Sequence, residues 1–138
     1  MPVHATGYAH VRLTVTDIAA SRRFYEDVFG FEIAYELPPD ADDATRQALG
    51  FLFGGVIYRL PEGQLLGLRP VGPAGDRFDE DRVGLDHLSF GVDDLDAAVA
   101  VLDELGLAHE PVKDLGGARI VELRDPDGIA LELYAFTR

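Results

Sequence analysis

Two histidines and one glutamate carry the side chains from which this sequence can build a metal site. His10, His87 and Glu132 each lie in a segment where apolar and polar residues alternate, which is typical of β-strands. Two imidazoles and one carboxylate form a ligand set suited to Fe²⁺, Mn²⁺, Zn²⁺, Ni²⁺ or Co²⁺. Three protein ligands leave coordination positions open for water and for a chelating substrate, as a catalytic site needs. The site requires three strands that bring these side chains to one surface.

The strand that carries Glu132 follows a strong turn signal. Residues 125–128 read Asp-Pro-Asp-Gly, in which proline presets one backbone angle and glycine accepts a positive φ. Residues 118–124 and 129–136 alternate on the two sides of this turn, so the sequence predicts a β-hairpin. Glu132 stands among apolar strand residues near the C-terminus, where a carboxylate needs a partner.

The strands that carry the two histidines belong to an internal repeat. Residues 8–15 and 85–92 both alternate, and each segment is followed by aspartate and then by apolar residues at helical spacing. We expect the two helices to end at Gly30 and Gly106. Four residue pairs share an offset of 77, namely His10/His87, Val15/Val92, Asp17/Asp94 and Ile18/Leu95. A repeat of this kind constrains the fold more than any single element does.

Three further strands are expected after the helix in each copy. Their ranges are 31–37, 55–60 and 64–69 in the first copy, and 108–112, 118–124 and 129–136 in the second. An insertion with room for one short helix occupies 38–50. The sequence therefore predicts an α+β fold of two βαβββ modules within one domain, 1–138. The expected parts are a first module at about 6–69, a solvated linker at about 70–83 and a second module at about 84–138.

Alternation also predicts which side chains face the proposed site. One face of each curved mixed sheet should pack against its helix through Val11, Leu13, Val15, Leu88, Phe90, Val92, Leu131 and Leu133. The opposite faces should line a central cleft with His10, Arg12, Thr14, His87, Ser89, Glu132 and Tyr134. The three candidate ligands thus share the polar faces.

Composition excludes several classes of function. The net charge of -13 argues against nucleic acid or an anionic membrane as a partner, because both require clustered Lys and Arg. No apolar run approaches the roughly 18 residues of a membrane-spanning helix. The N-terminus shows no signal-peptide pattern, and the absence of cysteine excludes disulfides and thiolate chemistry. These features fit a cytoplasmic protein.

The same motifs carry a resemblance to a known family. They are His10 in its strand, the helix end at 21–31 (SRRFYEDVFGF), the segment 85–90 (LDHLSF) and the segment 125–134 (DPDGIALELY). With these motifs the chain resembles the vicinal oxygen chelate superfamily, which includes glyoxalase I, extradiol dioxygenases, fosfomycin-resistance enzymes and bleomycin-resistance proteins. The resemblance covers nearly the whole chain and is specific for the superfamily, not for a reaction. It implies a central metal or ligand cleft, a small-molecule substrate or drug, and a homodimer.

Departures from family patterns narrow the expected chemistry. Glyoxalase I and the related epimerases carry a fourth ligand on the last strand of the first module. Aligning Gly63 with Gly128 puts Gly67 at that position, and glycine has no side chain to bind a metal. Extradiol dioxygenases usually have a tyrosine where this chain has Glu122, and a catalytic histidine in a region where 110–121 has none. Glu122 either replaces a proton-transfer group or is merely solvated.

Three functions follow from the resemblance. The first is a metal-dependent enzyme, dioxygenase-like in its three-ligand site, in which His10, His87 and Glu132 hold the ion. The second is a metal-free, bleomycin-resistance-type protein that sequesters a drug. The third is a glyoxalase or isomerase, or an addition enzyme of the fosfomycin type. For the enzyme, the expected substrate contacts are Arg12, Tyr134, Ser89 and Arg69, and Glu132 and Glu122 are the expected catalytic carboxylates.

Simpler interpretations exist for the same residues. A histidine in a strand is often satisfied by backbone partners, and a glutamate can discourage edge-to-edge aggregation of strands. Arg69 can be a surface residue at a strand end, and Tyr134 can be a pocket wall. Equivalence within the repeat, together with Glu132, favours the metal site over these readings.

Overall fold

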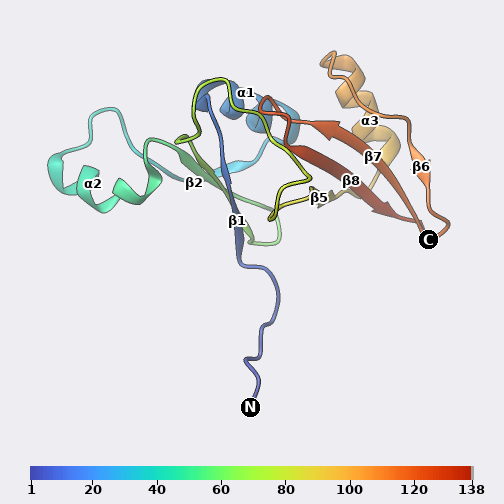
Figure 1. Ribbon diagram of the computed structural model, residues 1–138, viewed down its shortest axis with the longest axis horizontal. Helices are drawn as coiled ribbons and strands as arrows, with labels where there is room; N and C mark the ends of the chain where they lie inside the picture. The colour runs from blue at the N-terminus through green and yellow to red at the C-terminus, as the bar shows by residue number, and fades with distance from the viewer. Residues whose placement is uncertain (138) are drawn as a thin grey trace. The chain divides into compact units, whose positions relative to one another are not determined.

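A computed structural model describes residues 1–137. The chain forms two compact units. The first unit spans Met1–Gly75 and the second spans Asp76–Arg138. The division falls inside the range 70–83 that the sequence predicts as a linker. Each unit contains a four-stranded mixed sheet with a helix packed on it, so the predicted α+β fold of two βαβββ modules is confirmed (Figure 1).

The first unit begins with the strand and helix that the repeat predicts. Its elements are β1 (His10–Thr14), α1 (Ile18–Phe29), β2 (Glu32–Glu36), α2 (Asp43–Ala48), the 3₁₀ turn η1 (Gly50–Leu52), β3 (Val56–Arg59) and β4 (Leu65–Arg69). The strand order is β1-β4-β3-β2, with β1 and β4 parallel and the other pairs antiparallel. The Asp17 side chain accepts a hydrogen bond from the Ala20 amide and begins α1. Gly30 ends α1 at a φ of 62°, as glycine allows.

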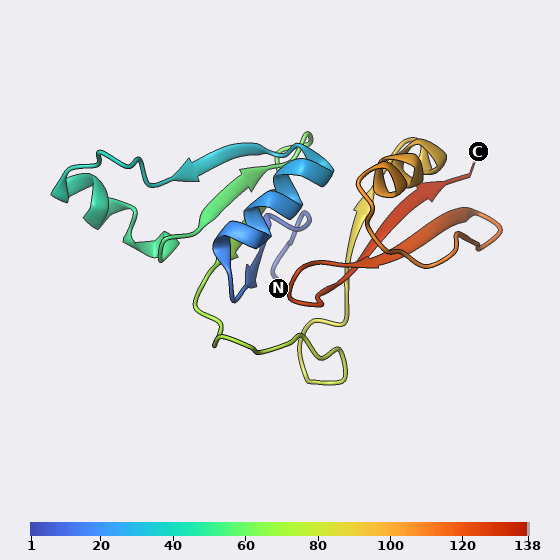
Figure 2. The same ribbon diagram turned by 90° about the horizontal axis from the view of Figure 1, so that it is seen from above.

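The second unit repeats this plan without the insertion. Its elements are β5 (Leu88–Gly91), α3 (Leu95–Glu104), β6 (Lys113–Asp114), β7 (Ala118–Arg124) and β8 (Ala130–Phe136), in the sheet order β5-β8-β7-β6. Asp94 begins α3 by accepting from the Ala97 amide, as Asp17 does for α1. Figure 2, which turns the view by 90°, shows α3 lying over one face of its own sheet.

The core of each unit lies between helix and sheet, on the predicted faces. Leu13, Val15, Phe90, Leu131 and Leu133 are buried, whereas His10, Thr14, His87 and Ser89 on the other faces are exposed. Two aromatic rings, Tyr25 of α1 and Tyr58 of β3, are fully buried in the first unit. The polar face of each sheet therefore has no helix over it.

Three details differ from the sequence-based expectations. A continuous strand at 108–112 is not formed; an isolated bridge joins His109 to Leu123, and the short β6 follows at 113–114. The 3₁₀ turn η1, which the sequence does not predict, follows the insertion and begins at its last residue, Gly50. Part of the expected solvated linker is held in place, since the Phe78 amide donates to the Asp127 carbonyl oxygen. Among residues 1–137, no helix has both the length and the apolar character that a bilayer-spanning segment requires.

Candidate functional site

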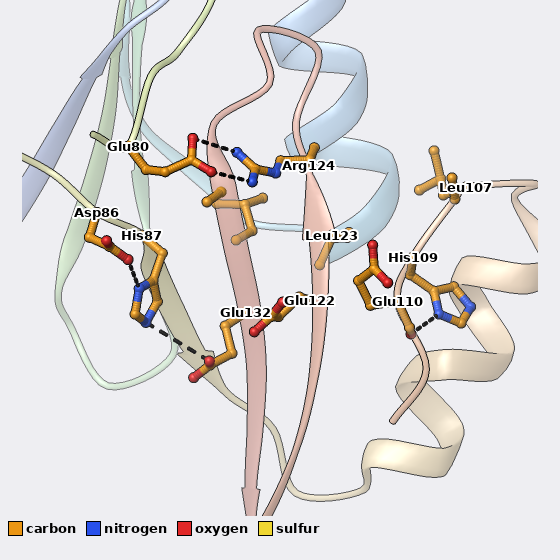
Figure 3. A pocket seen from close by; sticks show the side chains of 13 residues that line it. Glu80, Asp86, His87, Leu107, His109, Glu110, Glu122, Leu123, Arg124 and Glu132 are labelled. Carbon is orange, nitrogen blue, oxygen red and sulfur yellow. Dashed lines mark hydrogen bonds and ion pairs between the residues drawn. The ribbon is translucent and has the colours of Figure 1, made fainter. Parts of the chain in front are cut away.

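A pocket of about 440 Å³ opens on the polar face of the second unit (Figure 3). Its lining combines β7 and β8 with the segments before β5 and after α3. The polar side chains that line it are Glu80, Asp86, His87, His109, Glu110, Glu122, Arg124 and Glu132. Five of these are carboxylates, so the pocket is acidic. It contains two of the three predicted ligands and both predicted catalytic carboxylates.

Glu132 is placed by the parallel pairing of β5 with β8. Its register partner is Ser89, whose hydroxyl donates a hydrogen bond of 3.0 Å to Glu132 Oε1. The side chain of Glu132 is only 14% exposed although it projects from the polar face of the sheet. On the other side, β7 places Glu122 directly opposite Glu132 in antiparallel register. Two carboxylates paired across strands repel each other, and Lys113 Nζ, 3.4 Å from Glu122 Oε1, offsets part of this repulsion.

His87 is oriented by the residue before it. Its Nδ1 lies 2.7 Å from Asp86 Oδ1, which leaves Nε2 turned toward Glu132, 3.9 Å from Oε2 (Figure 3). The hydrogen bond to Asp86 raises the pKa of His87, and the charges of Glu132, Asp86 and Glu122 act in the same direction. A histidine held by a carboxylate through one ring nitrogen and presenting the other is typical of metal-ligating histidines.

The donor set of the second unit fits a divalent metal ion in type but is incomplete. A distance of 3.9 Å is too long for a hydrogen bond, yet it lets Nε2 and Oε2 contact one ion at ordinary bond lengths of about 2.0–2.2 Å. Among residues 1–137, no group of three or more His, Cys, Asp or Glu side chains suited to a metal is present. His87 and Glu132 are therefore two candidate ligands and not a complete site.

Several residues of the pocket were not anticipated from the sequence. Glu80 forms two hydrogen bonds with the guanidinium of Arg124, at 2.7 and 3.2 Å, and this partner lowers the pKa of Glu80 to about 2. His109 is held by the Glu110 carbonyl oxygen and by Asp103 of α3. The sequence predicts the charge run at 76–82 as solvated linker, and no local pattern indicates that Glu80 pairs with Arg124, 44 residues away.

Tyr134 lies on β8 two residues beyond Glu132 and is partly exposed. Its ring contacts Phe136 edge to face, with centroids 5.0 Å apart. It shares the face of Glu132 and is opposite Ile120 of β7. Tyr134 does not line the pocket itself, and it extends the polar face beyond it.

The first unit carries the other predicted residues on its own polar face. His10 begins β1 and is exposed, and Arg12 pairs in parallel register with Gly67 of β4. The pair Arg12 and Gly67 is thus equivalent to the pair Ser89 and Glu132 in the second unit. This register supports the alignment that leaves the first unit without a carboxylate ligand on β4. Arg69 ends the same strand and lies over the ring of Phe53.

Comparison with known proteins is consistent with this architecture. The model of the Glyoxalase/Bleomycin resistance protein/Dioxygenase superfamily matches residues 7–133. Protein YaeR of Escherichia coli (strain K12), itself uncharacterised, is 35% identical over 127 residues, which cover 91% of this chain and 92% of YaeR.

Solved structures of similar proteins have the same fold. A glyoxalase/bleomycin resistance protein/dioxygenase domain from Frankia sp. EAN1pec superposes with a TM-score of 0.75 at 31% identity, covering 98% of this chain and 95% of that one. The fosfomycin resistance protein FosX of Listeria monocytogenes has a TM-score of 0.69 at 20% identity, covering 97% and 96%. At that identity the likeness to FosX concerns the fold alone.

Proposed function

Because the chain belongs to the Glyoxalase/Bleomycin resistance protein/Dioxygenase superfamily, we propose that it is a metal-dependent enzyme acting on a small molecule with vicinal oxygens. His10, His87 and Glu132 hold one divalent ion, with Fe²⁺ or Mn²⁺ favoured over Zn²⁺, Ni²⁺ and Co²⁺. The substrate completes the coordination through two adjacent oxygens. A dioxygenase-like reaction is the preferred class, because three ligands leave room for more than one exchangeable group.

One observation carries the proposal. His87 Nε2 and Glu132 Oε2 face each other at 3.9 Å across an acidic pocket, and each is fixed on its far side by its own partner. Asp86 fixes the imidazole and Ser89 fixes the carboxylate, at 2.7 and 3.0 Å. Side chains oriented in this way lose little freedom when an ion binds. A bound cation also offsets the repulsion between Glu132 and Glu122.

The chain's own residues supply the remaining functions. A divalent ion in this position acts as a Lewis acid toward the substrate's oxygens when bound. Glu122, 44% exposed and opposite Glu132, is the group that accepts a proton from a substrate held there. Ser89 and Tyr134 contact the substrate from β5 and β8, and Arg12 and Arg69 contact it from the first unit. The protein acts in the cytoplasm as a homodimer.

Metal content tests the proposal directly. Protein purified without oxygen is analysed for bound elements, alongside Glu132→Ala, Glu132→Gln and a control, Glu110→Gln. We expect near-stoichiometric Fe²⁺ or Mn²⁺ in the native chain and in the control, and loss of most of it in both Glu132 variants, since Glu132 is the anionic ligand of the proposed set. Glu110 lines the same pocket and is exposed, so its removal controls for the change in charge alone. Full metal content in Glu132→Gln would refute the assignment.

The acidity of the pocket favours one alternative, a metal-free protein that sequesters a cationic drug. Five carboxylates line the pocket against one arginine and two histidines, and the whole chain carries a net charge of -13. Binding of a cationic aromatic ligand that is unchanged after metal removal would support this alternative. If metal is present, its identity and the reaction it supports would separate oxygenation from glyoxalase, isomerase or fosfomycin-type addition chemistry.

A further inference from the structure

The polar face of the first unit is cationic where that of the second unit is anionic. At the position equivalent to Glu132, β4 has Gly67, and the stem of Arg12 lies across it. A Cβ built on Gly67 would lie 3.0 Å from Arg12 Cγ, closer than nearly all real contacts. The missing side chain therefore does more than remove a metal ligand. It makes the space in which the arginine of the neighbouring strand lies.

Two arginines share one aromatic support on this face. The guanidinium carbon of Arg69 lies 4.4 Å from the centroid of Phe53, and that of Arg12 lies 5.9 Å from the same centroid. Arg12 also donates from Nη2 to the carbonyl oxygen of Phe51. Both contacts come from residues that follow the insertion, Phe51 in η1 and Phe53 directly after it. This segment thus holds two cations close together.

Phe53 adopts a backbone conformation that is uncommon for its residue type. Phe53 has a φ of 52°, and it is the one residue other than glycine with a positive φ within 1–137. A bulky aromatic residue is uncommon in this left-handed region, and glycine would adopt the conformation more easily. The next residue, Gly54, also has a positive φ. Phenylalanine, and not glycine, therefore occupies the first of two consecutive positions with a positive φ. The ring is retained where the backbone disfavours it.

Neither guanidinium has the anionic partner that this chain offers in abundance. Arg22 and Arg59 of the same unit pair with glutamates, at 2.8 and 2.9 Å for Arg22 and 4.0 Å for Arg59. Among residues 1–137, no carboxylate lies within ion-pair distance of Arg12 or Arg69, although the sequence has 25 acidic residues. Arg12 Nε is buried and has no hydrogen-bond acceptor. A buried charged donor without a partner is costly, and a bound anion supplies the missing acceptor.

We propose that Arg12 and Arg69, supported by Phe53, form a subsite for an anionic group of the substrate, a carboxylate or a phosphate. A planar guanidinium presents paired donors that match the oxygens of such groups. The assignment of this anion to the substrate rests on the proposed function, and it makes the substrate a molecule with a negatively charged group besides its chelating oxygens. The binding of an anion by the arginines does not depend on a metal.

Inorganic phosphate is the probe, added to full-length protein from which metal has been removed by a chelating resin. Ionic strength is held constant with chloride, and the Nε–Hε signals of the arginines are followed by NMR. We expect a saturable shift of the Arg12 signal, with a Kd on the order of 1 mM for so small an ion. Arg69→Gln should raise that Kd about ten-fold, since it removes one charge-assisted contact. Arg59→Gln, which removes an arginine from the neighbouring strand β3, should leave it unchanged.

A second variant keeps the test valid if substitution of an arginine disturbs the fold. Gly67→Ala places a methyl group against the stem of Arg12 and should weaken phosphate binding several-fold while both charges remain. A linear, unsaturable shift, or equal effects of Arg69→Gln and Arg59→Gln, would overturn the proposal. Because the protein is metal-free, that failure would leave the metal assignment intact. Loss of metal binding in the separate experiment would likewise leave this subsite intact.

Discussion

At the scale of single residues, one strand position gives the two open sheet faces opposite charge. The register pairs Ser89 with Glu132 in the second unit and Arg12 with Gly67 in the first. In one unit a small residue on the first strand leaves room for a carboxylate on the last. In the other a glycine on the last strand leaves room for an arginine on the first. The repeat is thus preserved in backbone and reversed in charge.

His109 provides a pH-dependent contact that links α3 to the sheet. Its Nδ1 lies 2.8 Å from the Glu110 carbonyl oxygen and its Nε2 lies 2.7 Å from Asp103 Oδ1. These partners raise the pKa of His109, with the Glu110 carbonyl oxygen contributing most. The folded state therefore binds its proton more tightly than the unfolded state does, so the contribution to stability is complete at pH values below about 6 and is lost as pH rises through the folded-state pKa.

Urea unfolding at several pH values measures this effect. Between about pH 5.5 and 8.5, the difference in unfolding free energy between native protein and His109→Gln should shrink as pH rises. Glutamine keeps hydrogen-bonding capacity without titrating in this range, so the comparison removes contributions from the other histidines. A difference that stays constant with pH, or grows, would show that protonation of His109 does not stabilise the fold. The groups that face it are Asp103 on α3 and Glu110 beside it.

At the scale of elements, the β7–β8 hairpin depends on the side chain of Asp125. This residue is 5% exposed, and its Oδ1 accepts from the amides of Asp127 and Ile129, both at 2.9 Å. Asp125→Ala should lower the free energy of unfolding by about 2–4 kcal/mol, because two backbone donors lose a charged acceptor in a buried turn. Denaturant titration checks the value.

The matched variant for the turn is Asp125→Asn, which keeps an oxygen in the same place but removes its charge. It should cost less than half as much as Asp125→Ala, since both amides still have an acceptor. Equal losses for the two variants would mean that charge, and not the pair of hydrogen bonds, stabilises the turn. Unchanged stability of Asp125→Ala would exclude a role of this side chain in holding the hairpin.

Elements with strong local signals were predictable, and those defined by tertiary contacts were not. The hairpin strand β7 (118–124) was placed without error, because period-two alternation and the Asp-Pro-Asp-Gly turn agree. The expected strand at 108–112 is reduced to one bridge at His109, whose side chain is engaged by Asp103 of α3. η1 has no alternation or capping signal, and its contact with Arg12 is long-range. Contacts between distant residues leave no periodic trace in a sequence.

The same distinction applies to the candidate site. The repeat offset of 77 paired His10 with His87, and the registers make the next residues along, Val11 and Leu88, equivalent in the two units. The contact of Phe53 with two arginines depends on a left-handed backbone conformation at Phe53, which no local sequence pattern indicates. The ligand assignment itself stays a prediction, because His10 belongs to one unit and its proposed partners belong to the other.

At the scale of the whole molecule, the proposed ligand set predicts that a bound metal ion stabilises the folded chain. It also predicts that this stabilisation requires residues of both units. An ion that binds only the folded state adds RT ln(1 + [M]/Kd) to the unfolding free energy, about 2.7 kcal/mol at a hundred-fold excess over Kd. His10→Ala in the first unit and Glu132→Gln in the second should each abolish most of this gain, and the double variant should lose no more than either single one. Residues that ligate one ion act as a unit, whereas independent sites would give additive losses.

Thermal unfolding of metal-free and metal-loaded protein measures the gain, with Arg59→Gln as a control that should keep all of it. If His10→Ala retains the full gain while Glu132→Gln loses it, the ion is held by the second unit alone, with water or substrate in place of a third protein ligand. That outcome would contradict the three-ligand site while leaving the His87–Glu132 pair as a metal-binding element. If instead the His10→Ala and Glu132→Gln variants lose the metal-dependent stabilisation non-additively, His10 and Glu132 ligate one ion.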